Sequence, residues 1–334
     1  MLYRVQLWRY QAHKNQGEKK IMKKLSEIVA AVKDYPVKRV AVAAAEDPTV
    51  LDAVKMATEG DVATAVLVGD EKAIRAYAEQ TGLRLAKEDV VDEPVPERAA
   101  LCAAQLVSSG RADVLMKGHI HTDDFLRAVL DKEVGLRTGY RMSHVFACEM
   151  PAFDRLIVVT DSAMNIAPDL EAKAEIILNA DYFCEVIGIS SPRVACLAAV
   201  ELLNPQMPAT VDATCLAKMA DRNQYAPTCI VDGPFALDNA LSPAAARHKQ
   251  IGGPVAGQAN VLLVPDIEAG NILVKSFVYA AQAKVAGVVI GAKAPVVLTS
   301  RADSAESKFF SIAAAVLTSG VERALRLKIG KVHY

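Results

Sequence analysis

The chain has 334 residues, of which 52% are hydrophobic and 5% aromatic, and its formal net charge is -1 at pH 7. This length is enough to bury a sizeable core in two domains of ordinary size. The near-zero charge gives no electrostatic reason to expect nucleic acid or a membrane surface as a partner, and no run approaches the roughly 18 uninterrupted apolar residues of a membrane span.

The first 21 residues differ from the rest of the chain. They include Trp8, the only tryptophan, among Arg, Gln, Lys and His with no clear period, and they lack the apolar region of a secretory signal. Met22 is followed by the pattern of an amphipathic helix over residues 23–33. We predict that residues 1–21 are a non-native or extension segment and that Met22 is the natural start. An ordered extension that packs on the body is the alternative.

Short apolar runs then alternate with helical patterns. Several runs are continuously apolar, which is typical of parallel strands covered on both faces. The predicted strands are 39–44, 64–68, 114–117, 156–160, 194–200, 228–231, 260–264, 288–290 and 296–299. The predicted helices include 48–58, 71–80, 97–109, 123–131, 170–179 and 269–282. This alternation predicts an α/β fold with parallel sheets, with a domain boundary near residue 140.

Ligands of such sheets bind at the carboxyl ends of the strands, so the strand-to-helix turns should carry the chemistry. In the last such turn, an apolar run ends in Thr299, Ser300 and Arg301, and Asp303 or Ser304 can cap the next helix. Free N–H groups, a helix dipole and a guanidinium together suit a phosphate. A carboxylate beside an anion site makes sense if it works as a base. The other unusually polar turns are 117–124, 161–165, 232–234 and 265–271.

Several common motifs are absent. No G-x-G-x-x-G follows a strand, residues 287–293 lack the Walker A spacing, and there is no G-x-S-x-G elbow, which disfavours dinucleotide, P-loop and serine-hydrolase chemistry. His119 and His121 precede Asp123 and Asp124, but no second cluster supplies further ligands, so we predict no metal. The six cysteines form no C-x-x-C pair and are interpreted as reduced thiols of a cytoplasmic protein.

Three blocks, taken together, resemble the phosphate acetyl/butyryl transferase family. The first is MKGHIHTDDFLR at 116–127, continuing to 135–139 and 143–145, and the second is VTDSAMNIAP at 159–168. The third joins VAG at 255–257, PDIEAGN at 265–271 and LTSR at 298–301. The first block looks closer to the butyryl branch, and the resemblance runs roughly from Met22 to the end of the chain.

The resemblance implies a reversible reaction in which a short acyl group, butyryl by preference, passes between coenzyme A and inorganic phosphate. The substrates are acyl-CoA and phosphate, with no cofactor and no metal, and the protein is expected to be a homo-oligomer without nucleic-acid or membrane partners. It also implies two parallel-sheet α/β domains of isocitrate/isopropylmalate dehydrogenase-like architecture with an interdomain cleft. One domain would comprise residues 22–140 plus 287–334, and the other residues 141–286.

The resemblance further implies site residues. In the family, an Asp six positions after the strand-end arginine is thought to take the thiol proton. Here that position is Ser307, so Glu306 is the first choice for the base and Asp303 the second. Arg301 matches the strand-end arginine, and Ser300 the serine that hydrogen-bonds the phosphoryl or carbonyl oxygen. The further substrate-binding candidates are Arg127, Lys117, Ser143, His144, Asn165, Asp161 and Ser307.

Other readings stay open. Lys275, Lys284, Lys293 and Lys308 are candidates for the adenosine 3′-phosphate of CoA, and a covalent route through Cys148 lacks an evident adjacent base. A phosphate acetyltransferase is the nearest alternative function. A catalytically weak CoA-binding homologue is favoured by the missing family aspartate, whereas a decarboxylating dehydrogenase would need a nucleotide loop and metal-binding carboxylates that the sequence lacks.

Overall fold

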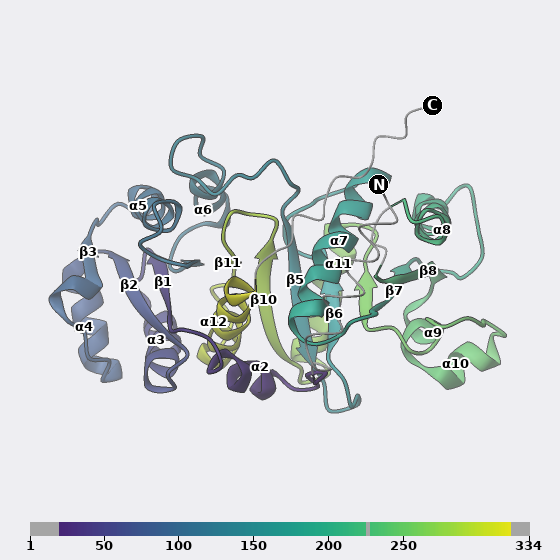
Figure 1. The fold of residues 1–334 in the computed structure, drawn as a ribbon, viewed down its shortest axis with the longest axis horizontal. Coiled ribbons are helices and arrows are strands. Elements are labelled where there is room, and N and C mark those ends of the chain that lie inside the picture. Colours follow the sequence, from purple (N-terminus) through teal and green to yellow (C-terminus); the bar gives the residue numbers. More distant parts are fainter. Residues whose placement is uncertain (1–19, 225–227, 322–334) are drawn as a thin grey trace.

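The computed structural model describes residues 20–224 and 228–321. Within these residues one 11-stranded sheet has the order β3-β2-β1-β4-β11-β10-β5-β6-β9-β7-β8 (Figure 1). The strands are β1 Lys38–Ala43, β2 Ala63–Gly69, β3 Val90–Asp92, β4 Val114–Lys117, β5 Ser143–Glu149, β6 Ile157–Thr160, β7 Arg193–Leu197, β8 Ile230–Phe235, β9 Val261–Leu263, β10 Lys284–Ile290 and β11 Val296–Val297. The helices are α2 Leu25–Val32, α3 Pro48–Glu59, α4 Glu71–Thr81, α5 Pro96–Ser108, α6 Thr122–Val129, α7 Leu170–Val186, α8 Pro208–Asp221, α9 Leu237–Leu241, α10 Pro243–His248, α11 Ile267–Tyr279 and α12 Ala305–Gly320.

Side-chain caps fix where five of the helices begin. In each case the oxygen of an aspartate or serine accepts a hydrogen bond from the backbone N–H three residues later, which satisfies one of the unpaired donors of the first turn. Such a cap typically stabilises a helix by about 1 kcal/mol. The capping residues of α3, α4, α7, α11 and α12 are Asp47, Asp70, Asp169, Asp266 and Ser304.

The sheet is mostly parallel, which confirms the predicted α/β class, but its centre is antiparallel. Strand β10 is antiparallel to both β11 and β5, and β5 is antiparallel to β6. The parallel strands on either side of this centre therefore run in opposite directions. The antiparallel strands β5 and β10 lie side by side and link the two parallel sets, an arrangement that the sequence did not indicate. The predicted domain boundary at 286/287 falls within β10.

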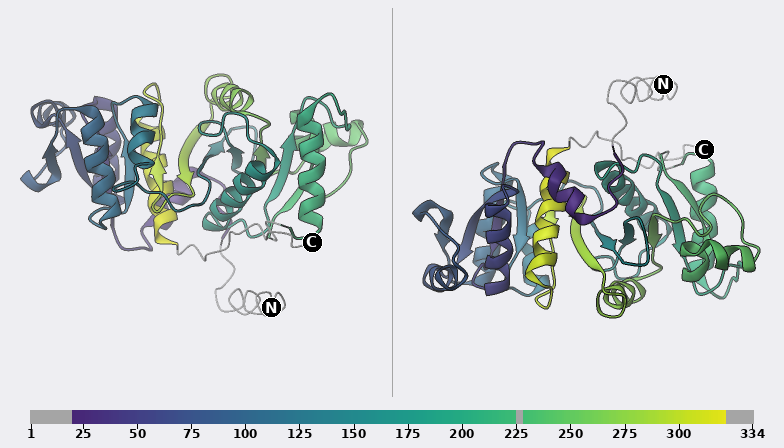
Figure 2. Two further views of the ribbon diagram at one scale, coloured as in Figure 1. Left: turned by 90° about the horizontal axis from the view of Figure 1, so that it is seen from above. Right: turned by 90° about the horizontal axis from the view of Figure 1, so that it is seen from below.

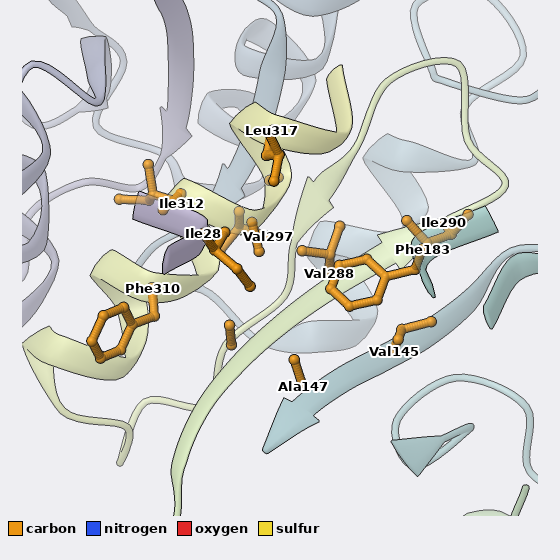
Figure 3. Packing of buried hydrophobic residues seen from close by; sticks show 14 of the residues in the cluster. Ile28, Val145, Ala147, Phe183, Val288, Ile290, Val297, Phe310, Ile312 and Leu317 are labelled. Carbon is orange, nitrogen blue, oxygen red and sulfur yellow. The ribbon is translucent and has the colours of Figure 1, made fainter. Parts of the chain in front are cut away.

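The hydrophobic core differs between the two faces of the sheet. On one face a single cluster runs under α2, α3, α12 and α7, as the packing of Ile28, Val288 and Phe183 shows (Figure 3). On the other face, where α11 lies across the sheet from α7 (Figure 2), the core is split. One cluster lies beneath α5 and α6, and another lies beneath α9, α10 and α11. A split core on one face leaves room for a cleft between the two clusters.

Most predicted elements are confirmed, with instructive omissions. All nine predicted strands overlap observed ones, whereas β3, β5 and helices α8 to α10 were not predicted. The predicted extension at 1–21 lies outside the described residues, apart from Lys20 and Ile21. In the part of the chain that the structure describes, no helix is both long and apolar enough to cross a membrane.

Candidate active site

A cleft of about 550 Å³ lies on the face where the core is split. Its floor is apolar, with Phe146 from β5, Val285 from β10 and Leu298 just after β11. Gly287 pairs with Phe146 across the sheet, and a Cβ atom at Gly287 would come within 2.8 Å of the Phe146 ring. The polar end and the opposite wall add Thr122, Ser162, Ala163, Ile267, Glu268, Asn271, Ile272, Val274, Lys275, Val278, Tyr279, Thr299, Ser300 and Asp303.

Lys117, at the carboxyl end of β4, is a buried cation that has no carboxylate partner among the residues that the structure describes. Its side chain is on the same sheet face as Leu115, because alternate residues of a strand share a face. The residue is 3% exposed, and within the described residues its Nζ atom makes one long hydrogen bond of 3.5 Å, to the Gly118 carbonyl oxygen. Burial, with smaller contributions from the Arg301 and Lys308 charges, lowers the pKa of Lys117 to about 8.

Two further cations approach Lys117 from the β11–α12 turn. Arg301 is exposed, and its Nη2 atom lies 3.0 Å from Nδ1 of His121, the residue that precedes α6. This contact joins the turn after β4 to the turn after β11. Lys308 is buried on α12, donates a hydrogen bond to the Ser300 carbonyl oxygen, and has its pKa lowered by burial. Three cations that meet in this way favour an anion with several negative oxygens.

The two candidate bases lie in different surroundings. Asp303 lines the cleft, accepts a hydrogen bond of 2.8 Å from the Ser300 N–H, and has its pKa raised by burial against the lowering effect of Lys308. Glu306 is exposed, pairs with Lys284 at 2.7 Å and is not among the cleft-lining residues. Asp303, the second choice for the base, therefore lies near the cations, whereas Glu306, the first choice, is engaged in an ion pair with Lys284.

Ser307, the position of the family aspartate, helps to cap α12. Its backbone N–H donates to Ser304 Oγ at 3.1 Å, and the two hydroxyl oxygens lie 3.2 Å apart. Ser300 lines the cleft, and its Oγ atom accepts a hydrogen bond from the Ala302 N–H. Of these two serines, Ser300 is placed to contact a ligand directly.

The turn after β6 forms a second part of the cleft wall. Asp161 is buried, which raises its pKa, and its carboxylate accepts hydrogen bonds from the backbone N–H groups of Ala163 and Met164 at 3.0 and 3.1 Å. The Asn165 side chain donates to Asp161 and to the Met142 carbonyl oxygen. Asp161 and Asn165 thus organise the turn, while Ser162 and Ala163 face the cleft.

Of the predicted site residues, Ser300 and Asp303 are among those that line the cleft, and the others, including Lys117 and Arg301, are not. Ser143 is buried and its Oγ atom accepts a hydrogen bond of 2.8 Å from Asn179. His144 is buried with its ring 4.1 Å from the Phe146 ring, and burial lowers its pKa to about 4, so it is neutral at pH 7. The Arg127 side chain is 80% exposed and pairs with Asp124 one turn earlier.

The four lysines that are candidates for the adenosine 3′-phosphate of CoA lie in different surroundings. Lys275 on α11 lines the cleft, and Lys308 stands at its cationic end. Lys284 pairs with Glu306, and Lys293 donates to the Ser108 carbonyl oxygen away from the cleft. Sequence patterns did not identify some of the cleft-lining residues, because these look like ordinary core and helix positions. They are Phe146 of β5 and Ile272, Val274, Val278 and Tyr279 of α11.

The histidines considered for a metal site and the thiol of Cys148 lie in surroundings that bear on their chemistry. Among the described residues no group of three or more His, Cys, Asp or Glu side chains is arranged to hold a metal ion. His119 lies 3.5 Å from Asp47, apart from the His121 contact with Arg301. Burial raises the pKa of Cys148 to about 12, so its thiol is protonated at neutral pH and a poor nucleophile.

The chain is similar in sequence to known proteins of one family. The family model described as "Phosphate acetyl/butaryl transferase" matches residues 23–98 and 86–316. The chain is 49% identical to phosphate butyryltransferase of Clostridium acetobutylicum over 300 residues, covering 90% of this chain and 99% of that protein. It is 46% identical to phosphate acetyltransferase of Thermotoga maritima over 276 residues, covering 83% of this chain and 93% of that protein.

A solved structure supports the same grouping. The branched-chain phosphotransacylase of Enterococcus faecalis superimposes with a TM-score of 0.73 at 35% identity, covering 85% of this chain and 99% of that one. The fold described above is therefore similar to that of a solved phosphotransacylase.

Proposed function

The chain belongs to the phosphate acetyl/butyryl transferase family, and on this premise we propose that it transfers a short acyl group reversibly between coenzyme A and inorganic phosphate. The observation that carries the proposal is the cation cluster of Lys117, Arg301 and Lys308 beside the Asp303 carboxylate, at the end of an apolar cleft. The cations can bind phosphate, the apolar floor can pack against an alkyl chain, and the Asp303 carboxylate can accept a thiol proton.

Phosphate occupies the cationic end in this proposal. Arg301 offers a planar pair of donors and Lys117 a compact charge. A bound anion also removes the main cost of burying the Lys117 ammonium, since the described part of the chain offers that group only a carbonyl oxygen at 3.5 Å. The two groups would stabilise the negative charge on the phosphoryl oxygens as the bond to the acyl group forms or breaks.

Asp303 is the base in this proposal. In the direction of thioester formation, its carboxylate accepts the CoA thiol proton, and the thiolate attacks the carbonyl carbon of the acyl phosphate. The C–S bond forms, the C–O bond to phosphate breaks, and the leaving phosphate takes the bonding pair and then the proton from Asp303. A free thiol has a pKa of about 8.5, so a carboxylate whose pKa is raised by burial is a better match than an ordinary one.

The CoA arm follows the outer wall along α11. Ile272 and Tyr279 line the cleft and are 66% and 70% exposed, which gives the pantetheine chain apolar surface to cover. Lys275, on the same wall, is the candidate of the four lysines best placed for a CoA phosphate. We propose butyryl as the preferred acyl group, supported by the name of the 49% identical relative and by the apolar floor. Acetyl is the alternative, supported by the relative at 46%.

Two coarser expectations belong to the same proposal. We infer a cytoplasmic location from the six cysteines, all of which are free thiols in the structure. We also infer a homo-oligomer from the family resemblance, and light scattering coupled to size-exclusion chromatography measures its mass directly.

The experiment follows CoA release from acetyl-, butyryl- and hexanoyl-CoA with a thiol reagent, with and without phosphate. We expect phosphate-dependent release that is fastest with butyryl-CoA. Asp303→Asn should lower kcat by about 10²-fold or more, whereas Glu306→Gln, a matched change at an exposed ion pair, should stay within a few-fold of wild type. A reversed pattern would return the base role to Glu306, and no phosphate-dependent release from any substrate would favour a CoA-binding homologue.

A further inference from the structure

Two hydroxyl groups of the cleft wall are buried without a partner. Ser162 is 1% exposed and Thr299 is 6% exposed, and both line the cleft. Within the described residues neither Ser162 Oγ nor Thr299 Oγ1 has a hydrogen-bond partner. A buried hydroxyl without a partner costs free energy, and native proteins pair the large majority of such groups. Two of them in one cleft indicate that the partner is a ligand.

The backbone that carries each hydroxyl is held in place, so rotation about χ1 is the movement left to the hydroxyl. The Asp161 carboxylate holds the turn that carries Ser162, and α11 packs directly behind it. A Cβ atom at Gly270 of α11 would come within 2.8 Å of the Ser162 Cα and Cβ atoms. Thr299 is held between Leu298, which is buried in the core, and Ser300, whose N–H is bound by Asp303.

The position of the two hydroxyls favours a carbonyl oxygen over a phosphate. They are uncharged donors and share the cleft with the apolar Phe146 and Leu298, whereas the cations that suit a phosphate gather around Lys117. A carbonyl oxygen has two lone pairs and can accept one hydrogen bond from each hydroxyl.

We propose that Ser162 and Thr299 donate hydrogen bonds to the acyl carbonyl oxygen and stabilise the oxyanion that forms on it. This inference rests on the proposed function. When the thiolate attacks, the C–S bond forms and the carbonyl π pair moves to oxygen. That oxygen bears the negative charge until the C–O bond to phosphate breaks. Each hydroxyl turns about χ1 to meet the substrate, and no proton leaves either residue.

The test compares Thr299→Val with Thr318→Val, because the two threonines are both buried but only one has a partner. Thr318 Oγ1 donates to the Ala314 carbonyl oxygen at 2.7 Å. Replacing Thr299 removes an unpaired hydroxyl, so kcat should fall by about 10²-fold while Tm stays the same or rises. Replacing Thr318 should lower Tm and leave kcat within twofold. Ser162→Ala should behave as Thr299→Val does, with the KM for phosphate unchanged in both.

The outcomes distinguish a failure of the proposed hydroxyl pair from a failure of the proposed function. Wild-type kcat in both Ser162→Ala and Thr299→Val, with an active parent enzyme, would overturn the hydroxyl pair alone. A loss of activity that follows a fall in Tm would show a structural role and overturn it as well. If the parent protein releases no CoA from any short acyl-CoA, the proposed function fails first, and the hydroxyl pair fails with it.

Discussion

Lys117→Met should make the protein more stable and at the same time unable to respond to phosphate. A pKa of about 8 in place of 10.5 means that the folded protein bears a cost on the order of 3 kcal/mol for holding this lysine charged. Methionine of similar length removes that cost, so the variant should gain up to about 3 kcal/mol at pH 7. The pKa of Lys117 is lower in the folded state than in the unfolded state, so wild-type stability rises between about pH 8 and pH 10.5. The stability difference between the variant and the wild type closes over the same range.

Phosphate narrows the difference in stability between the two proteins in this prediction. A ligand present at 100 times its Kd stabilises the folded state by about 2.7 kcal/mol, and the wild type should show an upward shift in Tm as phosphate is added. Lys117→Met should show little or none. Thermal unfolding followed at pH 7 and pH 10, with and without phosphate, measures all of these effects.

Lys293→Met is the matched control for this experiment. Its ammonium group also binds a backbone carbonyl oxygen, that of Ser108, but on an exposed surface away from the cleft. The control should leave both Tm and the phosphate response unchanged. The reasoning is refuted if Lys117→Met lowers Tm in phosphate-free buffer, or if it keeps the full phosphate shift.

Three further predictions concern the same cleft. Arg301→Ala should lower kcat/KM for phosphate by about 10²-fold or more, whereas Arg127→Ala, at an exposed pair with Asp124, should stay within twofold; equal losses would remove the special role of Arg301. The value of kcat/KM for phosphate should fall above pH 8 as Lys117 loses its charge, and Lys117→Arg should move that fall to higher pH; an unmoved pH profile would assign it to another group. Cys148→Ala should keep most activity, because burial raises the thiol pKa to about 12, and near-complete loss in a folded variant would indicate a covalent route.

Most strands of the two parallel sets were predictable because their residues are largely apolar, whereas the three-residue β3 was too short to recognise. Strand β4 was predicted with its observed bounds, Val114–Lys117. Strand β5 was not, because it begins with Ser143 and His144 and ends with Glu149, and only its neighbours show why these polar residues are tolerated. His144 rests on Phe146 where Gly287 has no side chain, an arrangement that depends on a residue more than 140 positions away.

The site shows the same limit at the level of single residues. The strand-to-helix turn that carries Ser300 and Arg301 was predictable, because an apolar run precedes it and a capped helix follows it. The sequence could not show which of the two carboxylates faces the cleft, because that depends on where each side chain points and on a partner distant in the sequence. Asp303 precedes the Ser304 cap and folds back onto the Ser300 N–H, while Glu306 is inside the first turn and faces Lys284. The unpaired hydroxyl of Thr299 is likewise visible only in three dimensions.

The most direct measurement of the central claim is the ³¹P NMR spectrum of the protein incubated with butyryl-CoA and phosphate, recorded while free thiol is counted in parallel. Acyl transfer to phosphate predicts that butyryl phosphate and free CoA appear in a one-to-one ratio, and that Arg301→Ala slows both together. Release of CoA without an acyl phosphate resonance would show hydrolysis in its place and would contradict the account.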